Sequence, residues 1–150
     1  MRTGREFWSF IAEGILDNGW AVAIPSYPLA PEVRISSITS SIIQAVEKIA
    51  SKTKGPLRLI GHSAGGHLVS RVVCKKMLVN ETLQRVEKVI SVSGIHDLRP
   101  ILNTKMNKIL GLTYSEVETE SSIFCSPENI PLTCWVGADE RPEFLRQNRL

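Results

Sequence analysis

The turn Gly61-His62-Ser63-Ala64-Gly65 constrains the fold of this chain more than any other feature of its sequence. An apolar segment, 57–60, precedes the turn, and apolar residues at helical spacing follow it from Ala64 onward. A serine in a tight turn between a strand and a helix adopts a strained backbone conformation, and it needs very small residues two positions away on either side. The glycines of the turn meet that need, so the pattern predicts that Ser63 presents its hydroxyl group above the end of a strand.

The main chain next to Ser63 has a predicted role of its own. The first N–H groups of a helix have no partner within the helix, and they carry the positive end of the helix dipole. We therefore expect the Ala64 N–H to stabilise negative charge on an oxygen atom of a group that reacts with Ser63. A chance occurrence of G-x-S-x-G in a glycine-rich turn is the alternative, and the flanking strand and helix patterns favour the catalytic interpretation.

Helix-like and strand-like segments alternate along the chain. Periodicity and turn residues predict helices at about 5–18, at 37–52, from 64 onward and at 142–150, strands at 20–25, 57–60, 86–93 and 132–136, and short helices with loops between 97 and 129. Such alternation is typical of parallel strands joined by right-handed crossovers. The predicted fold class is therefore α/β, with a mostly parallel sheet, helices on both faces and the functional site at the carboxyl ends of the strands.

Composition indicates the general class of protein. With 150 residues, 43% of them hydrophobic and 22% charged, the chain is expected to form a single domain, 1–150, with a buried core. The formal charge of +3 is spread along the sequence, which favours a solvated surface over nucleic-acid binding. Three cysteines without metal-ligand spacing predict neither a metal site nor a disulfide framework. The sequence has no long apolar run and no signal-peptide pattern, so we expect a cytoplasmic protein that does not bind membranes.

A serine nucleophile needs a base, and the base needs a carboxylate that orients it. Asp139 follows the last predicted strand at its carboxyl end, and it is the predicted acid. Its alternative role is to cap the helix that begins near Pro142. Asp97, which follows the preceding strand, is the second candidate, and Glu140 and Glu143 are weaker candidates.

No histidine of the chain stands where the base of such a site is expected. The histidines of the chain are His62, His67 and His96, and all of them precede the predicted acid, whereas the chain order in a site of this kind is serine, acid, histidine. The first belongs to the turn and should point away from Ser63, and the second should pack within its helix. His96 stands at a strand end and is the low-ranking candidate base within the chain. We therefore expect the base to lie beyond Leu150.

Several stretches, spread over most of the chain, carry a family resemblance. They are Gly61-His62-Ser63-Ala64-Gly65-Gly66-His67-Leu68 with Ser26-Tyr27-Pro28-Leu29-Ala30-Pro31-Glu32, and the segments 19–27, 30–35, 93–100 and 136–140 with Glu143-Phe144 and Arg146-Gln147. The first pair resembles the esterase and lipase branch of the α/β-hydrolases. The other segments are similar to the kynurenine formamidase (arylformamidase) family and its bacterial relatives.

The resemblance implies a partial α/β-hydrolase fold in which Ser63 is the nucleophile and Asp139 the acid. It also implies a cytosolic serine hydrolase without a cofactor, often a homodimer, that acts on a small-molecule ester or formamide. Enzymes of the formamidase family hydrolyse N-formyl-kynurenine to kynurenine and formate in tryptophan breakdown. A general carboxylesterase and a non-catalytic, hydrolase-like binding module are the alternative functions.

Two features of the family are absent from the sequence. One is a His-Gly-Gly-x-Trp loop, which would stand just before Met1 and complete the oxyanion hole, and the other is the histidine of the triad. We therefore expect the chain to be an internal piece of a longer hydrolase, incomplete at both ends. Such a piece should have little activity of its own and should expose apolar surface that favours self-association.

Overall fold

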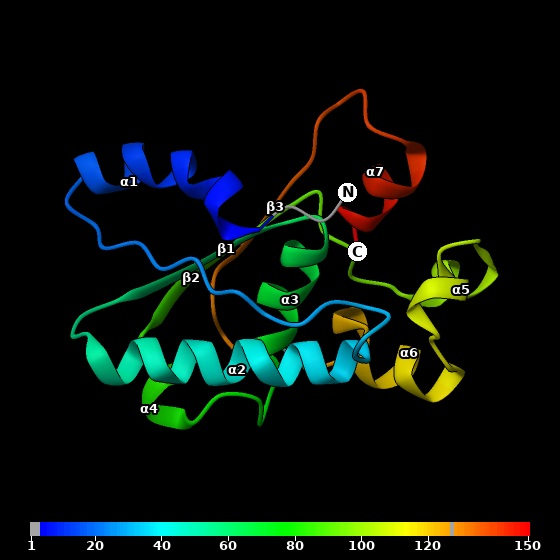
Figure 1. The fold of residues 1–150 in the computed structure, drawn as a ribbon, viewed down its shortest axis with the longest axis horizontal. Helices are drawn as coiled ribbons and strands as arrows, with labels where there is room; N and C mark the ends of the chain where they lie inside the picture. Colours follow the sequence, from blue (N-terminus) through cyan, green and yellow to red (C-terminus); the bar gives the residue numbers. More distant parts are fainter. Residues whose placement is uncertain (1–3, 127) are drawn as a thin grey trace.

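Three parallel strands form the sheet of this computed structural model, which describes residues 4–126 and 128–150. The strands are β1 (Leu57–His62), β2 (Val86–Val92) and β3 (Leu132–Trp135), hydrogen-bonded in the order β1-β2-β3 (Figure 1). Both strand pairs are parallel, so that part of the predicted fold class is confirmed. The three carboxyl ends therefore meet at one edge of the sheet.

The ladder of the sheet continues one residue beyond the strands. His62 pairs with Val92, which in turn pairs with Trp135. The Ser63 N–H then donates to the Val92 carbonyl at 2.8 Å. In the same way the Ser93 N–H donates to the Trp135 carbonyl at 2.6 Å. Ser63 and Ser93 therefore occupy equivalent positions at the ends of neighbouring strands.

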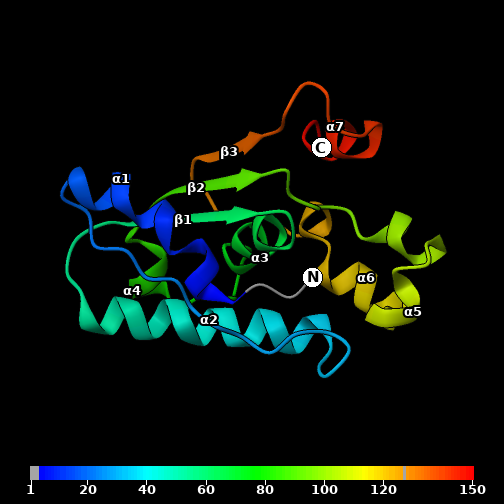
Figure 2. The ribbon, with the colours of Figure 1, turned by 45° about the horizontal axis from the view of Figure 1, so that its top comes forward.

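Helices connect and cover the strands. They are η1 (Arg5–Ile11), α1 (Ala12–Asp17), α2 (Ile35–Lys52), α3 (Ala64–Val72), α4 (Asn80–Leu83), η2 (Arg99–Asn103), α5 (Asn107–Leu110), α6 (Tyr114–Glu120), η3 (Ser122–Phe124) and α7 (Pro142–Gln147). Figures 1 and 2 show α2 and α3 on one face of the sheet and α1 on the other. Helices thus lie on both faces, as predicted, although the second face is only partly covered.

The main core lies between the sheet and the two longest α-helices. The buried residues Ile38, Ile42 and Val46 recur every four positions along α2, which aligns them on one helix face. They pack with Leu68 and Val72 of α3 and with apolar side chains of β1 and β2. Burial of these side chains holds the sheet, and hence the end of β1, against α3.

A second, smaller core lies beneath the loops after β2. Leu98, Leu112 and Val117 are buried there together with Ile35, the first residue of α2. This cluster fixes the segment 94–124 to the rest of the fold. That segment consists of short helices and loops, as predicted.

Two expectations for the first 25 residues need correction. The segment 5–18 is a 3-10 helix followed by a short α-helix, and no residue in either is buried. An α-helix gains most of its stability from burying an apolar face, and this segment buries none of its residues. The predicted strand 20–25 is wrong, because no backbone hydrogen bond among the described residues joins it to a strand. A strand needs a neighbouring backbone, and β1 pairs here on one edge only.

Candidate active site

The turn after β1 holds Ser63 in a strained conformation. Its φ is 55° and its ψ is −114°, a combination that residues other than glycine rarely adopt. The backbone is held on both sides, by the ladder bond to β2 and by the His67 N–H, which donates to the Ser63 carbonyl at 3.1 Å. The side chain is partly exposed, and its hydroxyl has no hydrogen-bond partner in residues 4–126 and 128–150. It is therefore open to an incoming group.

The steric requirement for glycine is confirmed at Gly61. A Cβ atom there would lie 2.1 Å from the Gly65 carbonyl oxygen and 2.2 Å from its carbon, which no real structure tolerates. The same prediction is wrong at Gly65, where a Cβ atom would meet nothing within 4 Å. The second close approach falls on Gly66 instead, whose Cβ would lie 2.8 Å from the Gly94 Cα. Position 61 must be glycine because the main chain of residue 65 passes close to it, and this would hold whatever side chain residue 65 carried.

The N-terminus of α3 faces the same turn. Ala64 is the first residue of this nine-residue helix, so its N–H has no acceptor within the helix. Ala64 is also exposed to solvent. The geometry is thus compatible with the predicted oxyanion role, since a free N–H and the helix dipole both favour negative charge there.

A second serine with a positive φ stands at the end of β2. Ser93 has a φ of 49° and is buried, with 5% of its surface exposed. Its hydroxyl donates a hydrogen bond to Oε1 of Glu140. The Gly137 N–H donates to the same oxygen at 3.2 Å. The Ser93 hydrogen bond, followed by that from Gly137 and the charge of His62, lowers the pKa of Glu140.

The two adjacent acidic residues after β3 differ in their surroundings. Asp139 lies in the turn 138–139, is exposed, and has no hydrogen bond or ion pair with any residue that the structure describes. Glu140 is partly buried and is tied to the end of β2 through Ser93. The role of Asp139 as the acid therefore stays a prediction. The contacts favour Glu140 for this role, although it was the weaker candidate in the sequence.

Asp97 and Glu143, the other candidate acids, are occupied by arginines. The Asp97 carboxylate is 2% exposed and pairs with Arg99 at 2.9 Å and with Arg146 at 3.1 Å. Hydrogen bonding by Arg99 is the main cause of its lowered pKa. Glu143 pairs with Arg146 at 2.7 Å, and that arginine likewise lowers the pKa of Glu143. The Asp97 carboxylate ties α7 to the loop after β2 through Arg146, whereas Glu143 pairs within α7, and neither carboxylate contacts the serine turn.

Gln147, which the sequence offered only within the family resemblance and not as a site residue, completes this attachment of α7. Its side-chain oxygen accepts from the N–H groups of His96 and Asp97, both at 2.8 Å. Its side-chain nitrogen donates to the Asp97 carbonyl at 2.9 Å. The loop that carries Glu140 is thus held at one end by β3 and at the other by α7. The family resemblance of Arg146-Gln147 is the signal in the sequence that includes this residue.

His96, the low-ranking candidate base, does not reach Ser63. Its Nδ1 lies 3.1 Å from the Ser70 hydroxyl, and its Nε2 lies 3.3 Å from the Ser91 hydroxyl. The ring is 5% exposed, and burial lowers its pKa. Both nitrogens therefore face buried hydroxyl groups behind the sheet, so the structure does not bring this histidine and the nucleophile together.

His67 packs within its helix, as the sequence predicts, whereas the direction of the His62 side chain stays a prediction. His67 is buried in α3, its Nδ1 lies 3.0 Å from the Ile95 carbonyl, and burial lowers its pKa to about 4. His62 is exposed, and its ring centre lies 6.3 Å from that of Trp8. Neither histidine contacts the Ser63 hydroxyl. The serine turn therefore has no base among the histidines of this chain.

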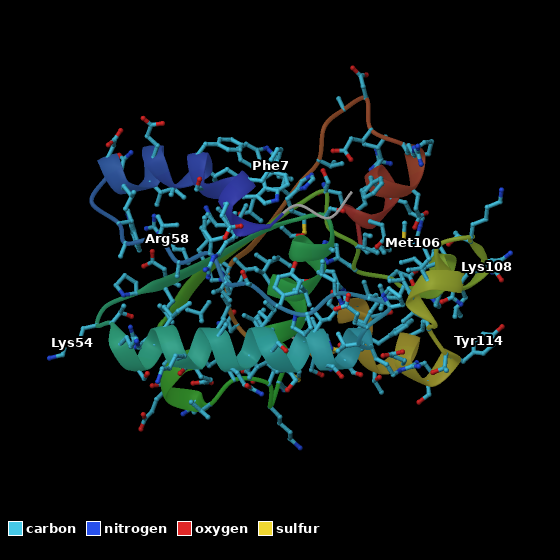
Figure 3. All side chains as sticks on the ribbon, in the orientation of Figure 1. Phe7, Lys54, Arg58, Met106, Lys108 and Tyr114 are labelled. Carbon is cyan, nitrogen blue, oxygen red and sulfur yellow. The ribbon has the colours of Figure 1, made fainter. Side chains whose placement is uncertain are left out.

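An apolar surface flanks the serine turn on the α1 side of the sheet. Trp8 contacts Phe7 with 5.1 Å between ring centres and Phe10 with 6.4 Å. Figure 3 shows Phe7 and Arg58 on the side of the sheet away from α2. Phe7 is 59% exposed and Trp135 of β3 is 67% exposed. The predicted exposure of apolar surface is therefore confirmed for this face.

The described part of the chain also has hollows away from the serine turn. Hollows of about 420 and 310 Å³ lie around η2, α5 and α6, and neither includes Ser63. Among residues 4–126 and 128–150, no group of three histidine, cysteine or acidic side chains is placed to hold a metal ion. No helix in this range combines the length and the apolar character that crossing a bilayer requires.

Known proteins that are similar to this chain share its α/β fold. The sequence profile of the alpha/beta hydrolase fold family matches residues 8–129. A solved structure, described as a "putative thioesterase" from Silicibacter sp., superposes with a TM-score of 0.96 at 43% identity and covers 99% of this chain and 57% of that one.

Two curated relatives are named kynurenine formamidase. The protein from Danio rerio is 29% identical over 150 residues, which cover 93% of this chain and 50% of the relative. The protein from Salmo salar is 29% identical over 155 residues, which cover 96% of this chain and 52% of the relative. The chain thus spans about half the length of the curated relatives it matches.

Proposed function

The chain belongs to the alpha/beta hydrolase fold family, and from this premise we propose that it carries the nucleophile and the acid of a serine hydrolase. The observation that carries the proposal is the strained turn at Ser63, with its φ of 55°. Strain of this kind persists only where the surrounding structure enforces it, and it is concentrated at functional sites. The Ala64 N–H beside the serine, which donates to no other described residue, supports the same assignment.

Glu140 is the acid in this proposal, with Asp139 as the competing candidate. An orienting carboxylate has to be ionised, fixed in direction and open on one side to an imidazole N–H. Ser93 and Gly137 fix Oε1 of Glu140, and the pKa of this carboxyl is lowered. Its Oε2 accepts from no described residue, so that oxygen is available. Glu140 follows β3, and its hydrogen bond to Ser93 holds the carboxylate at the end of β2, the strand next to the one that leads to Ser63.

The base comes from outside these 150 residues in this proposal, because the described hydrogen bonds join none of the chain's histidine rings to the Ser63 hydroxyl. The imidazole takes the proton of the Ser63 hydroxyl, and Oγ attacks the carbonyl carbon of the substrate. The resulting oxyanion accepts a hydrogen bond from the Ala64 N–H. The bond to the leaving group then breaks as the imidazole returns the proton, and water hydrolyses the acyl-serine.

The substrate class is an ester or a formamide, as in the kynurenine formamidases to which the chain is 29% identical. A thioester is the second candidate, and the 43% identity to the protein described as a thioesterase favours it. All three substrates offer a carbonyl carbon to Ser63. The exposed aromatic surface around Trp8 supports a substrate with an apolar or aryl part.

One experiment compares the three substrates on the purified chain. We incubate it with p-nitrophenyl acetate, an acetyl thioester and N-formyl-kynurenine, and we locate any acyl group by peptide mass spectrometry. The expected result is slow acylation of Ser63 by at least one of them, abolished in Ser63→Ala. Product release that persists in Ser63→Ala would contradict the proposal. Fast turnover that is lost in His96→Ala would make His96 the base.

A second experiment separates the two acids. Imidazole added to the solution can replace a missing histidine side chain, so it should accelerate acylation of Ser63. We expect Glu140→Gln to remove most of this acceleration and Asp139→Asn to retain it, because only Glu140 is tied to the end of β2. The reverse pattern would assign the role to Asp139.

A further inference from the structure

Ser93 is a buried hydroxyl group that the sequence did not assign to the site. It lies at the end of β2, at the position equivalent to Ser63 on β1, and it shares with Ser63 a positive φ. Its N–H continues the sheet ladder by donating to the Trp135 carbonyl at 2.6 Å. The only polar side-chain contact that the structure gives its hydroxyl among the described residues is the hydrogen bond to Glu140.

The choice of serine at this position needs a physical reason. A positive φ is costly for a residue with a side chain, and glycine would adopt it freely. The next residue is in fact a glycine, and a Cβ at Gly94 would lie 2.0 Å from the Ser91 Oγ, so the chain turns sharply here. A serine in this conformation is strained, and glycine would form the same turn without that strain. The hydroxyl group, which glycine lacks, is therefore the feature that explains a serine at this position.

We propose that Ser93 is a positioning residue that fixes the Glu140 carboxylate at the carboxyl end of β2, beside the nucleophile turn. This inference rests on the proposed function, in which Glu140 is the acid. The hydroxyl and the Gly137 N–H hold Oε1 between them, so the carboxylate has one fixed oxygen and one free oxygen, Oε2. Without the hydroxyl, a single main-chain N–H of its own loop would restrain the side chain.

The position of Ser93 on the central strand explains why it can set this geometry. β2 lies between β1, which leads to the nucleophile, and β3, which leads to the acid. A group on β2 can therefore hold the acid loop in register with the nucleophile turn. The attachment of α7 by Gln147 restrains the far end of the same loop.

The test measures Glu140 directly, so it does not need turnover. Carboxyl-detected NMR titration of the full chain follows Glu140, which is identified by the resonance that Glu140→Gln removes. We compare the chain with Ser93→Gly and with Ser93→Ala. Glycine tolerates the positive φ, so Ser93→Gly should fold at least as stably and lose only the hydroxyl.

The expected result is a higher midpoint of the Glu140 titration in both variants, toward that of an unrestrained glutamate, together with averaging of its side-chain rotamers. Ser91→Ala is the matched control, because Ser91 is a buried serine of the same strand whose hydroxyl faces His96. It should leave Glu140 unchanged. The charge of His62 also acts on Glu140. The effect of Ser93→Gly should therefore persist in a His62→Gln background.

Two results can be told apart. An unchanged Glu140 midpoint and rotamer in Ser93→Gly would overturn the positioning role, whatever the reactivity of Ser63. Failure of Ser63 to form an acyl-enzyme under any condition, with a Glu140 titration that still depends on Ser93, would overturn the proposed function. The contact itself would then stand, although it would no longer serve a reaction.

Discussion

The two glycines of the G-x-S-x-G turn should respond in opposite ways to alanine. In Gly61→Ala, the new methyl group would lie 2.1 Å from the Gly65 carbonyl oxygen. This oxygen belongs to the backbone of α3, so it cannot move without shifting the start of the helix. In Gly65→Ala, the methyl group would meet no atom within 4 Å. The sequence motif treats these positions as equivalent, whereas the structure does not.

The magnitudes follow from packing and from helix propensity. Overpacking typically costs about 1–3 kcal/mol, and a clash with backbone belongs at the upper end, so we expect Gly61→Ala to destabilise the fold by about 3 kcal/mol. For a domain of this size, that corresponds to a fall in Tm of roughly 6–12 °C. Gly65 lies in the first turn of α3, where alanine should stabilise the helix by up to about 1 kcal/mol.

Urea denaturation followed by circular dichroism measures both changes on one scale. The expected result is a clear fall in the midpoint for Gly61→Ala and an equal or higher midpoint for Gly65→Ala. Equal losses in the two variants would refute the reasoning, because they would mean that position 65 also lacks room for a methyl group. A loss of Ser63 reactivity in Gly65→Ala without a loss of stability would be consistent with it, since the methyl group would then obstruct the substrate.

Two further predictions concern stability. Burial lowers the pKa of His67 from 6.5 to about 4 in the folded chain, so between these pH values the unfolded chain binds a proton that the folded chain does not. The free energy of unfolding should therefore keep its highest value above pH 6.5 and fall by about 3 kcal/mol as the pH is lowered to 4. His67→Gln should flatten that slope in urea titrations at several pH values, and an unchanged slope would contradict the assignment. Gln147→Ala should destabilise the chain by about 3 kcal/mol, because it leaves the N–H groups of His96 and Asp97 buried without an acceptor. Gln147→Met is its control, since methionine keeps the length of the side chain and lacks the amide, and a Gln147→Met variant as stable as the parent chain would argue against the role of the side-chain oxygen.

Local patterns were sufficient to predict the central part of the fold. The strands β1, β2 and β3 and the start of α3 were predicted to within a few residues, because each is a stretch rich in apolar residues, and β1, β2 and α3 also pack in the main core. The segment 20–25 has a similar pattern and is not a strand. Whether this segment forms a strand depends on the presence of a neighbouring strand to pair with, and the periodicity of the sequence gives no information about that neighbour.

In the candidate site, too, local features could be predicted from the sequence and tertiary contacts could not. The position of Ser63 and its conformation follow from the turn sequence, since the constraint at Gly61 is local. The contrast between Asp139 and Glu140 does not, because the residue that distinguishes them is Ser93, 46 positions away from Asp139 along the chain. Two adjacent carboxylates have the same local pattern, and only their tertiary contacts differ.

The central claim is that the turn after β1 presents Ser63 as a nucleophile, and covalent labelling tests it most directly. A fluorophosphonate reacts with an activated serine hydroxyl, and peptide mass spectrometry identifies the residue that carries the adduct. We predict a single adduct on Ser63 that is absent in Ser63→Ala and faster to form in the presence of imidazole. A correctly folded chain that gives no adduct at Ser63 with imidazole, or the same adduct in Ser63→Ala, would contradict the claim.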